Sequence, residues 1–312
     1  NGVGLVLVIA LPLAYYAAFH RATMSPQASL ALRAAGFVGF GLILHAVMMT
    51  YSRGSMIAAA LACAWLVWCH RPRRHALGLG VLGVAVILSL AGPDIRERAA
   101  SSFEVDVDSS AQSRLSSWEA AWDMTWDNPM LGAGMRNSVK FSHNFGADLP
   151  GRVVHNQYLQ VAADSGLPAA AIYVAMVGLS WMRLNGCRRT AVRAGEEARR
   201  LGDERAEARA QDAERLCLAL SASIIALASS AMFLSIEIIE LPWMLIMIAG
   251  VAPAAVMNRL SDTDETLPEA SHEPEPAYAP GGAMPAAAIG PALPGLVRPA
   301  TATAPHPTRR PR

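Results

Sequence analysis

The chain has 312 residues, of which 53% are hydrophobic and only 16% are charged, and its mean hydropathy is +0.29. A soluble domain carries about 25% charged residues, so this composition excludes an ordinary soluble protein and is typical of a polytopic membrane protein. The net charge of +1 offers nothing that would attract nucleic acid.

Seven apolar stretches are long enough, or nearly so, to cross the roughly 30 Å of a bilayer core as helices. They are residues 3–19, 34–50, 55–70, 76–92, 157–182, 216–236 and 240–257. Only Glu237, Glu240 and Pro242 separate the last two, which predicts a tight turn or a broken helix there. The expected fold is an all-α polytopic membrane protein with about seven transmembrane helices.

The sequence divides into four predicted parts. Residues 1–92 should be transmembrane helices with short connections, and residues 93–156 a long, partly helical loop. Residues 157–257 should hold the remaining spans, interrupted by a charged helical insert at 184–215, which a charged connector would also explain. Residues 258–312 are rich in proline and alanine and should form a disordered tail.

Arginines gather in the connections on one side of the predicted spans. The segments 20–33, 70–75 and 183–215 all carry them, and the span count places all three on one side. Because basic residues are retained on the cytoplasmic side, the insert and the tail should be cytosolic. The 93–156 loop should then face away from the cytoplasm.

Arg53 follows Ser52 and precedes Gly54 at a predicted span boundary on the non-cytoplasmic side. One interpretation is that its side chain snorkels to lipid headgroups. The other is an anion clamp, because guanidinium is always charged and presents planar, bidentate donors suited to phosphate.

Arg114 opens a segment with Trp118, Trp122 and Trp126 at steps of four, so that all four side chains share one helical face. A helix lying on the bilayer surface would explain the tryptophans, and Arg114 could still reach a site beneath it. Asn128-Pro129 should end this helix, because the residue before proline avoids the helical region. Gly132 and Gly134 should allow a tight turn back.

His155 stands at the end of the loop, directly before a predicted span. An isolated histidine is often only a structural hydrogen-bonding group, but its pKa near 6.5 also suits a general base. Asn156 and Tyr158 follow it and are candidates to orient it or to bind substrate. His143 competes for the role from the same loop, away from any span end.

Arg136, Lys140 and Arg152 make the second half of the loop basic, which predicts contact with substrate or with lipid headgroups. Asp164 lies inside the following span, where a carboxylate should face protein or a cavity rather than lipid. The four cysteines form no CxxC pair and look like free thiols. No metal-ligand spacing and no phosphate-binding Walker loop occurs, so we predict no cofactor.

These motifs in this order resemble the O-antigen ligase and O-antigen polymerase superfamily of bacterial inner membranes. Ser-Arg-Gly at 52–54 leads into a span, Arg114 precedes Trp118, and Asn-Pro-Met-Leu-Gly-Ala-Gly begins at 128. His-Asn-Gln-Tyr-Leu-Gln at 155–160 and Asp-Ser-Gly-Leu at 164–167 complete the pattern. It is also similar to the protein O-glycosylation ligase branch, including ligases found beside exosortase systems.

The resemblance covers roughly residues 1–257 and implies a metal-independent glycosyltransferase. Such an enzyme passes a glycan from an undecaprenyl-pyrophosphate carrier to a hydroxyl or amine of lipid A core, protein or glycan in the periplasm. Its arginines engage the pyrophosphate and its loop histidine is essential, which carries over to Arg53, Arg114 and His155. Family members have more spans, so we expect this chain to begin inside a larger protein.

Other functions remain open at this point. The same family includes polymerases of O-antigen or exopolysaccharide, which the sequence does not separate from ligases. A transporter of lipid-linked or anionic solute could use the same arginines without a chemical step, but it predicts polar residues deep within the spans. A non-catalytic scaffold leaves the outer arginines and His155 unexplained.

Overall fold

The computed structural model describes residues 2–20, 26–70, 78, 80, 81, 109–236 and 239–261. All of them belong to one compact unit, residues 1–263, and the second unit, residues 264–312, lies outside the described residues. Every regular element in the described ranges is a helix, as the composition predicts. The predicted span at 76–92, most of the start of the loop and the predicted tail fall outside these ranges.

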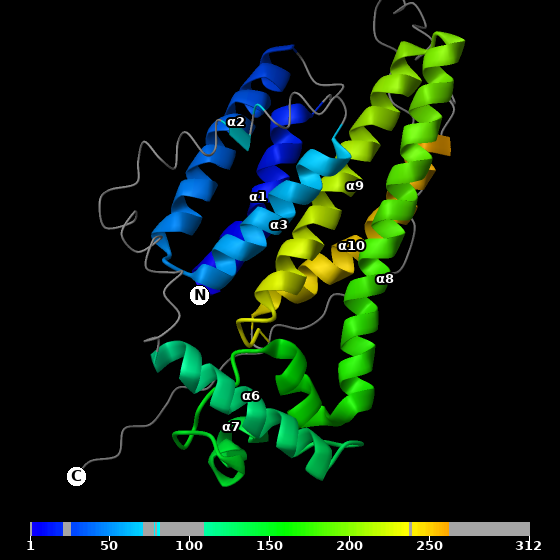
Figure 1. Ribbon diagram of the computed structural model, residues 1–312. Coiled ribbons are helices and arrows are strands. Elements are labelled where there is room, and N and C mark those ends of the chain that lie inside the picture. The colour runs from blue at the N-terminus through cyan, green and yellow to red at the C-terminus, as the bar shows by residue number, and fades with distance from the viewer. Residues whose placement is uncertain are drawn as a thin grey trace, which may run out of the picture. The chain divides into compact units, whose positions relative to one another are not determined.

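Figure 1 shows the helices in chain order. They are α1 (Gly2–Phe19), α2 (Pro26–Met49), α3 (Arg53–Cys69), α6 (Ser109–Asp127), α7 (Asn137–Phe141), the 3-10 helix η2 (Ser142–Phe145), α8 (Gln157–Leu201), α9 (Glu204–Ser230) and α10 (Glu240–Ser261).

Five of the described helices, α1, α2, α8, α9 and α10, are long and apolar enough to cross a membrane. The predicted span at 55–70 is present as α3, an apolar helix of 17 residues that is shorter than the other five. The predicted span at 216–236 ends earlier, because α9 stops at Ser230 and a non-helical connection follows. The part of the protein that the structure describes is therefore all-helical, as in a multi-pass membrane protein, and five of its helices are candidate membrane spans.

Helix α9 is the centre of the bundle. One of its faces packs with α1 and α3 through a core that includes Ala222 and Ala226, and the opposite face packs with α8 and α10 through Ile224 and Leu227. Small residues let helix backbones approach closely, which is how helices associate where lipid supplies no hydrophobic driving force. Two cores, one on each side of α9, thus hold the bundle together.

Helices α8 and α9 form an antiparallel hairpin that includes the charged segment 184–215. Gly202 takes the left-handed conformation that ends α8, and the Asp203 side chain caps α9 by accepting from the N–H of Ala206 at 2.8 Å. Across the turn, Arg199 pairs with Glu207. Local capping residues are therefore enough to explain where this hairpin turns.

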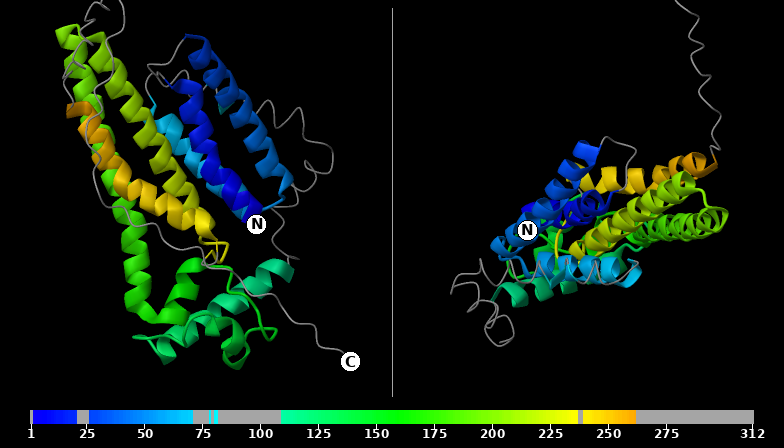
Figure 2. Two further views of the ribbon diagram at one scale, coloured as in Figure 1. Left: turned by 180° about the vertical axis from the view of Figure 1, so that it is seen from behind. Right: turned by 90° about the horizontal axis from the view of Figure 1, so that it is seen from above.

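The bundle has two ends, which we call the hairpin end and the loop end (Figure 2). At the hairpin end, the ring of Phe19 lies 4.9 Å from that of His70, and His20 Nδ1 lies 2.7 Å from a carboxylate oxygen of Asp212. At the loop end, α3 begins, α9 finishes, and α6 and α7 lie beside the start of α8 (Figure 1). The candidate residues of the sequence belong to the loop end.

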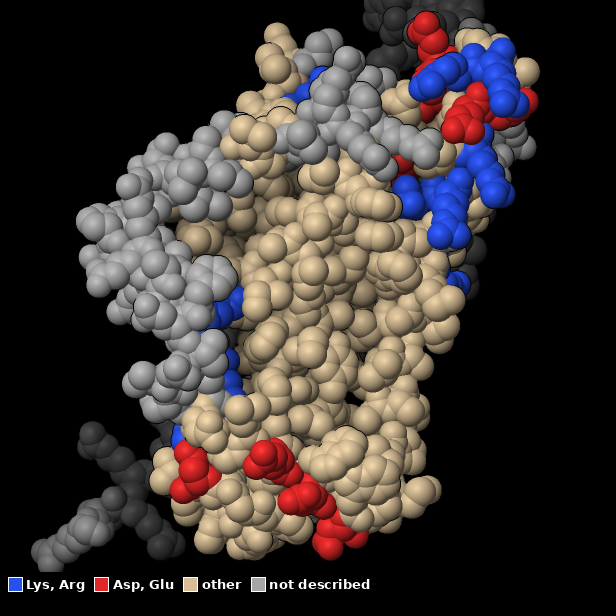
Figure 3. Space-filling model, in the orientation of Figure 1, with Lys and Arg blue, Asp and Glu red and all other residues tan. Residues whose placement is uncertain are grey.

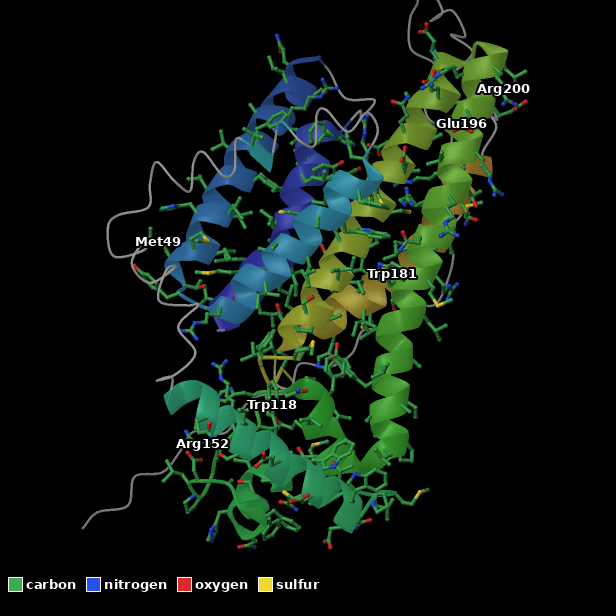
Figure 4. All side chains as sticks on the ribbon, in the orientation of Figure 1. Met49, Trp118, Arg152, Trp181, Glu196 and Arg200 are labelled. Carbon is green, nitrogen blue, oxygen red and sulfur yellow. The ribbon has the colours of Figure 1, made fainter. Side chains whose placement is uncertain are left out.

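Helix α6 ends before Asn128-Pro129, as the sequence predicts. Its tryptophans do not share one environment, however. Trp118 packs into a small core with Met124 and Val154, and Figure 4 shows it on α6 beside the first turns of α8. Trp122 and Trp126 contact each other and stay about half exposed, so only the first tryptophan anchors α6 to the protein.

Candidate functional site

The loop end is built where the Asn128–Gly134 segment crosses a break in α8. Backbone bonds join the two: Leu167 N donates to Pro129 O at 2.8 Å, and Ala133 N donates to Ala163 O at 2.8 Å. Gly134 N donates to Asp164 O at 2.9 Å. A helix break leaves backbone groups unpaired, and here the crossing segment supplies their partners.

Two glycines make this crossing possible. Gly166 has φ +84° and ψ 170°, a conformation that only glycine adopts readily, and a Cβ there would lie 2.4 Å from Met130 O. Gly132 has φ +66°, and its Cβ would lie 2.5 Å from the carbonyl carbon of Asp164. Gly166 and Gly132, the first glycine of the Gly-x-Gly pattern, are therefore packing requirements of this crossing.

Asp164 is buried beside the crossing. Its Oδ1 accepts a hydrogen bond from the backbone N–H of Ser138, at the start of α7, at 2.7 Å. The carboxylate faces protein, as expected for an acid at this depth. Its observed contact is structural: it holds α7 against α8.

His155 lies directly before α8 with a left-handed backbone, φ +54°. Such a conformation is uncommon in residues other than glycine and often marks a functional constraint. The side chain is half-buried, and its Nδ1 atom is shielded from solvent without a hydrogen-bond partner in the described structure. A buried ring nitrogen without a partner is uncommon, since most buried polar atoms are hydrogen-bonded.

The neighbours of His155 fix its backbone on both sides. Trp118 Nε1 donates to Val154 O at 3.0 Å, which ties the preceding residue to α6. Asn156 caps α8, because its Oδ1 accepts from the N–H groups of Tyr158 at 3.0 Å and Leu159 at 3.2 Å. Asn156 thus fixes the start of α8, directly after His155.

The surroundings of His155 favour a neutral imidazole. Burial lowers the pKa of His155 below its ordinary value of 6.5, and the positive charges of Arg114 and Arg152 lower that pKa further. A neutral imidazole can accept a proton at neutral pH, as a general base must.

The connection between α9 and α10 packs against the start of α8, directly after His155. Gln157, directly after the α8 cap, holds it at two points: its backbone N–H donates to Ala231 O at 2.8 Å, and its Oε1 accepts from the N–H of Ile236 at 2.6 Å. Ser235 Oγ also bonds with Gln160 Oε1. Three hydrogen bonds therefore join the first turn of α8 to residues 231–236.

Arg53 begins α3, the helix that meets the same connection through Gly54. It is the first residue of α3, its side chain is exposed, and Ser52 caps the helix before it. Gly54 packs against Phe233, so closely that a Cβ on Gly54 would lie 2.8 Å from Phe233 Cβ. Arg53 is one residue from Gly54 and His155 is two residues from Gln157. Gly54 and Gln157 both contact residues 231–236, so Arg53 and His155 belong to the same end of the protein.

Arg114 approaches from α6. It lies one turn before Trp118, which holds Val154, and its charge acts on the neighbouring His155 imidazole. Three segments far apart in the sequence thus bring Arg53, Arg114 and His155 to the loop end.

The remaining predicted residues have other positions. Arg152 pairs with Asp148 on the surface, with Nε donating at 2.8 Å, and it also acts on His155 electrostatically. Tyr158 donates its hydroxyl to Ala228 O at 2.9 Å, inside the bundle. Arg136 is exposed at the start of α7, and His143 is exposed in η2, so both lie on the outer surface of the loop.

Two parts of the site have no counterpart in the sequence analysis. Gln157 carries no charge and looks like an ordinary helix residue, and residues 231–236 look like the apolar end of a span. The only sequence signal near the connection is the acidic and proline punctuation at Glu237, Glu240 and Pro242. In the described ranges, no group of three or more His, Cys, Asp or Glu side chains could hold a metal ion.

This fold defines a class of protein: a multi-pass helical membrane protein with arginines and a histidine at one polar end. Residues 38–174 match the family model Wzy_C, described as O-Antigen ligase. Over this segment the chain is similar to the O-antigen ligase superfamily, whose members are ligases of the glycosyltransferase kind. The matched range includes Arg53, Arg114 and His155, whereas residues 231–236 lie outside it. A comparison with curated proteins gave no match.

Proposed function

We propose that this protein transfers a glycan from a polyprenyl-pyrophosphate carrier, undecaprenyl pyrophosphate in bacteria, to an acceptor hydroxyl or amine at the loop end, on the periplasmic side of the inner membrane. The observation that supports the proposal is that Arg53, Arg114 and His155, from three segments far apart in the sequence, lie at the same end of the protein, with Arg114 close enough to His155 to act on it electrostatically. The acceptor classes are lipid A core, a protein side chain, or a growing glycan.

Arg53 and Arg114 bind the pyrophosphate in this mechanism. Guanidinium groups form bidentate bonds with phosphate oxygens, and the N-terminus of α3 adds its own positive dipole beside Arg53. Negative charge grows on the leaving pyrophosphate as the bond to the sugar breaks. Contacts that strengthen with this charge accelerate the reaction, which equal contacts in the ground state would not do.

His155 accepts the proton of the acceptor as it attacks the anomeric carbon. The new bond joins that carbon to the acceptor oxygen or nitrogen, the old bond to the pyrophosphate oxygen breaks, and the polyprenyl pyrophosphate leaves with the bonding electrons. Direct displacement inverts the anomeric carbon. The lowered pKa of His155 keeps the base neutral and ready at neutral pH.

Single replacement of Arg53, Arg114 and His155 by alanine tests this proposal. With purified full-length protein, lipid-linked glycan and acceptor, we expect His155→Ala to slow transfer by about 10²–10⁴-fold. Each arginine variant should slow it by about ten- to a hundredfold, the effect of losing a hydrogen bond to a charged group. Arg199→Ala, at the hairpin end, is the matched control and should keep full activity.

The variants must be as abundant as the wild type and unfold at the same temperature, so that the loss of transfer is not a loss of folded protein. Full transfer by the His155 variant would remove the base from the mechanism. If the glycan crosses the membrane without forming a new covalent product, the protein is a transporter and the proposal is wrong.

A further inference from the structure

The arginines of α8 that follow its apolar part differ from those near the hairpin turn. Between Gly166 and Gly195 the sequence contains no acidic residue, yet it contains four arginines. Nearer the turn, arginines and acids are paired: Arg199 with Glu207 and Arg200 with Glu197. Figure 3 shows this change along the hairpin, with blue next to the tan apolar body and red joining it toward the tip.

Three of these arginines share one exposed face of α8. Arg183, Arg189 and Arg193 are exposed, and at 3.6 residues per turn they fall within about a third of the helix circumference. None of the three forms an ion pair with another residue that the structure describes. Arg188 lies on another side, where its Nε donates to Asn185 Oδ1 at 3.4 Å. We call Arg183, Arg189 and Arg193 the arginine face.

The arginine face lies where the apolar helices of the bundle end. Along the hairpin, Cys187 and Cys217 share one small core, and Gly195 packs against Ala210. Arg189 and Arg193 lie on α8 between Cys187 and Gly195. They are therefore level with the part of α9 between Ala210 and Cys217, which contains Asp212 and Arg215.

That stretch of α9 marks the end of α1. Asp212 pairs with His20 at 2.7 Å, and Arg215 Nη1 donates to Phe19 O. Helix α1 is apolar up to this point, and α3 ends at the same level, where His70 contacts Phe19. The arginine face is thus at the depth of lipid headgroups, with Arg183 deeper and able to extend its guanidinium outward along the helix.

We propose that the arginine face binds the headgroups of anionic phospholipids in the leaflet at the hairpin end. An exposed positive face without acidic partners complements phosphate, and guanidinium binds phosphate oxygens in pairs. Each arginine near an anionic surface strengthens binding about fivefold, so three give an effect on the order of a hundredfold. This binding is separate from glycan transfer, which occurs at the opposite end.

Retention of lipid by the full-length protein tests the proposal. The protein is extracted from vesicles of phosphatidylcholine with phosphatidylglycerol, and the bound lipids are counted by native mass spectrometry. The wild type should retain phosphatidylglycerol over phosphatidylcholine. The triple variant Arg183→Gln, Arg189→Gln, Arg193→Gln should lose most of this preference, and 0.5 M salt should weaken it in the wild type, because salt screens exposed charges.

Two matched variants separate the arginine face from net charge and from misfolding. The double variant Arg199→Gln, Arg200→Gln removes arginines that already have acidic partners and should keep the preference. The triple variant with lysine at positions 183, 189 and 193 keeps the positive charge, and it should keep most of the preference for phosphatidylglycerol.

Equal phosphatidylglycerol retention by the wild type and the glutamine triple variant would overturn the proposal. Equal loss in the Arg199 and Arg200 variant would also overturn it, because general charge would then explain the binding.

Discussion

At the scale of single residues, His155 combines three properties that rarely occur together. Its backbone is left-handed, its Nδ1 is buried without a partner in the described part of the chain, and its pKa is lowered by burial and by two arginines. The first two cost stability, because left-handed backbone and unpaired buried polar atoms are both unfavourable. Residues that are costly to the fold are commonly found at functional sites.

The pH dependence of transfer follows from the charge on His155. The base is active when neutral, so activity should fall as pH decreases through its lowered pKa, and the acidic limb should lie below pH 6.5. Arg152→Gln removes a positive charge that opposes protonation, so the limb should move to higher pH, toward 6.5. Rates measured from pH 4.5 to 8 check this, and a limb that moves to lower pH in the variant would contradict it.

At the scale of elements, residues 231–236 connect the two sides of the site. They contact α3 through Phe233 and α8 through Gln157, and so join the helix that begins with Arg53 to the helix that follows His155. The connection lies outside the segment that matches the family. The contacts that these residues make between α3 and α8 are therefore known from the packing of this chain and not from the family match.

Gln157→Met should slow transfer at least tenfold without unfolding the protein. The variant leaves the N–H of Ile236 buried without an acceptor, which costs about 1–3 kcal/mol and releases the connection. Gln160→Met is the graded control, since its partner Ser235 is only half-buried and can turn toward water. Transfer assays and thermal unfolding of both variants check this. An equal or larger loss in the Gln160 variant would assign the effect to general loosening.

The break in α8 makes a separate prediction about stability. Gly166→Ala forces a side chain into a conformation that costs about 1–3 kcal/mol and into contact with Met130 O, so the unfolding temperature should fall by roughly 5 °C or more. Gly178→Ala, in the regular part of the same helix with open space around it, should leave it unchanged or raise it slightly. Thermal unfolding in detergent measures both, and equal effects would show that the crossing does not depend on Gly166.

At the scale of the whole molecule, the bundle separates the candidate transfer site from the lipid-binding arginines. The candidate site lies at the loop end, and the arginine face and the charged turn lie at the hairpin end. Basic residues favour the cytoplasmic side, so the hairpin end should be cytosolic and the site periplasmic.

Accessible cysteines can establish this orientation. In right-side-out membrane vesicles, a membrane-impermeant maleimide should label Met135→Cys, which is 85% exposed in the loop. It should label Leu201→Cys, 75% exposed at the hairpin turn, only in inverted vesicles. The wild type is the background control, because three of its four cysteines are buried. The opposite labelling pattern would place the site in the cytosol and end the proposed periplasmic reaction.

The sequence by itself determined the elements of this protein. Apolar runs predict the spans, the residue pair Asn128-Pro129 predicts the end of α6, and charge and position single out Arg53, Arg114 and His155. These features depend on neighbouring residues, which is why they can be recognised along the chain.

Only the tertiary structure decided how these elements form a site. The unpaired Nδ1 of His155, the contact of Gly54 with Phe233 and the two bonds from Gln157 to residues 231–236 all join segments distant in sequence. Such contacts depend on helix packing around α9, which no local pattern encodes. For the same reason, Gln157 and Phe233 look like ordinary membrane-helix residues until the fold brings them to the loop end.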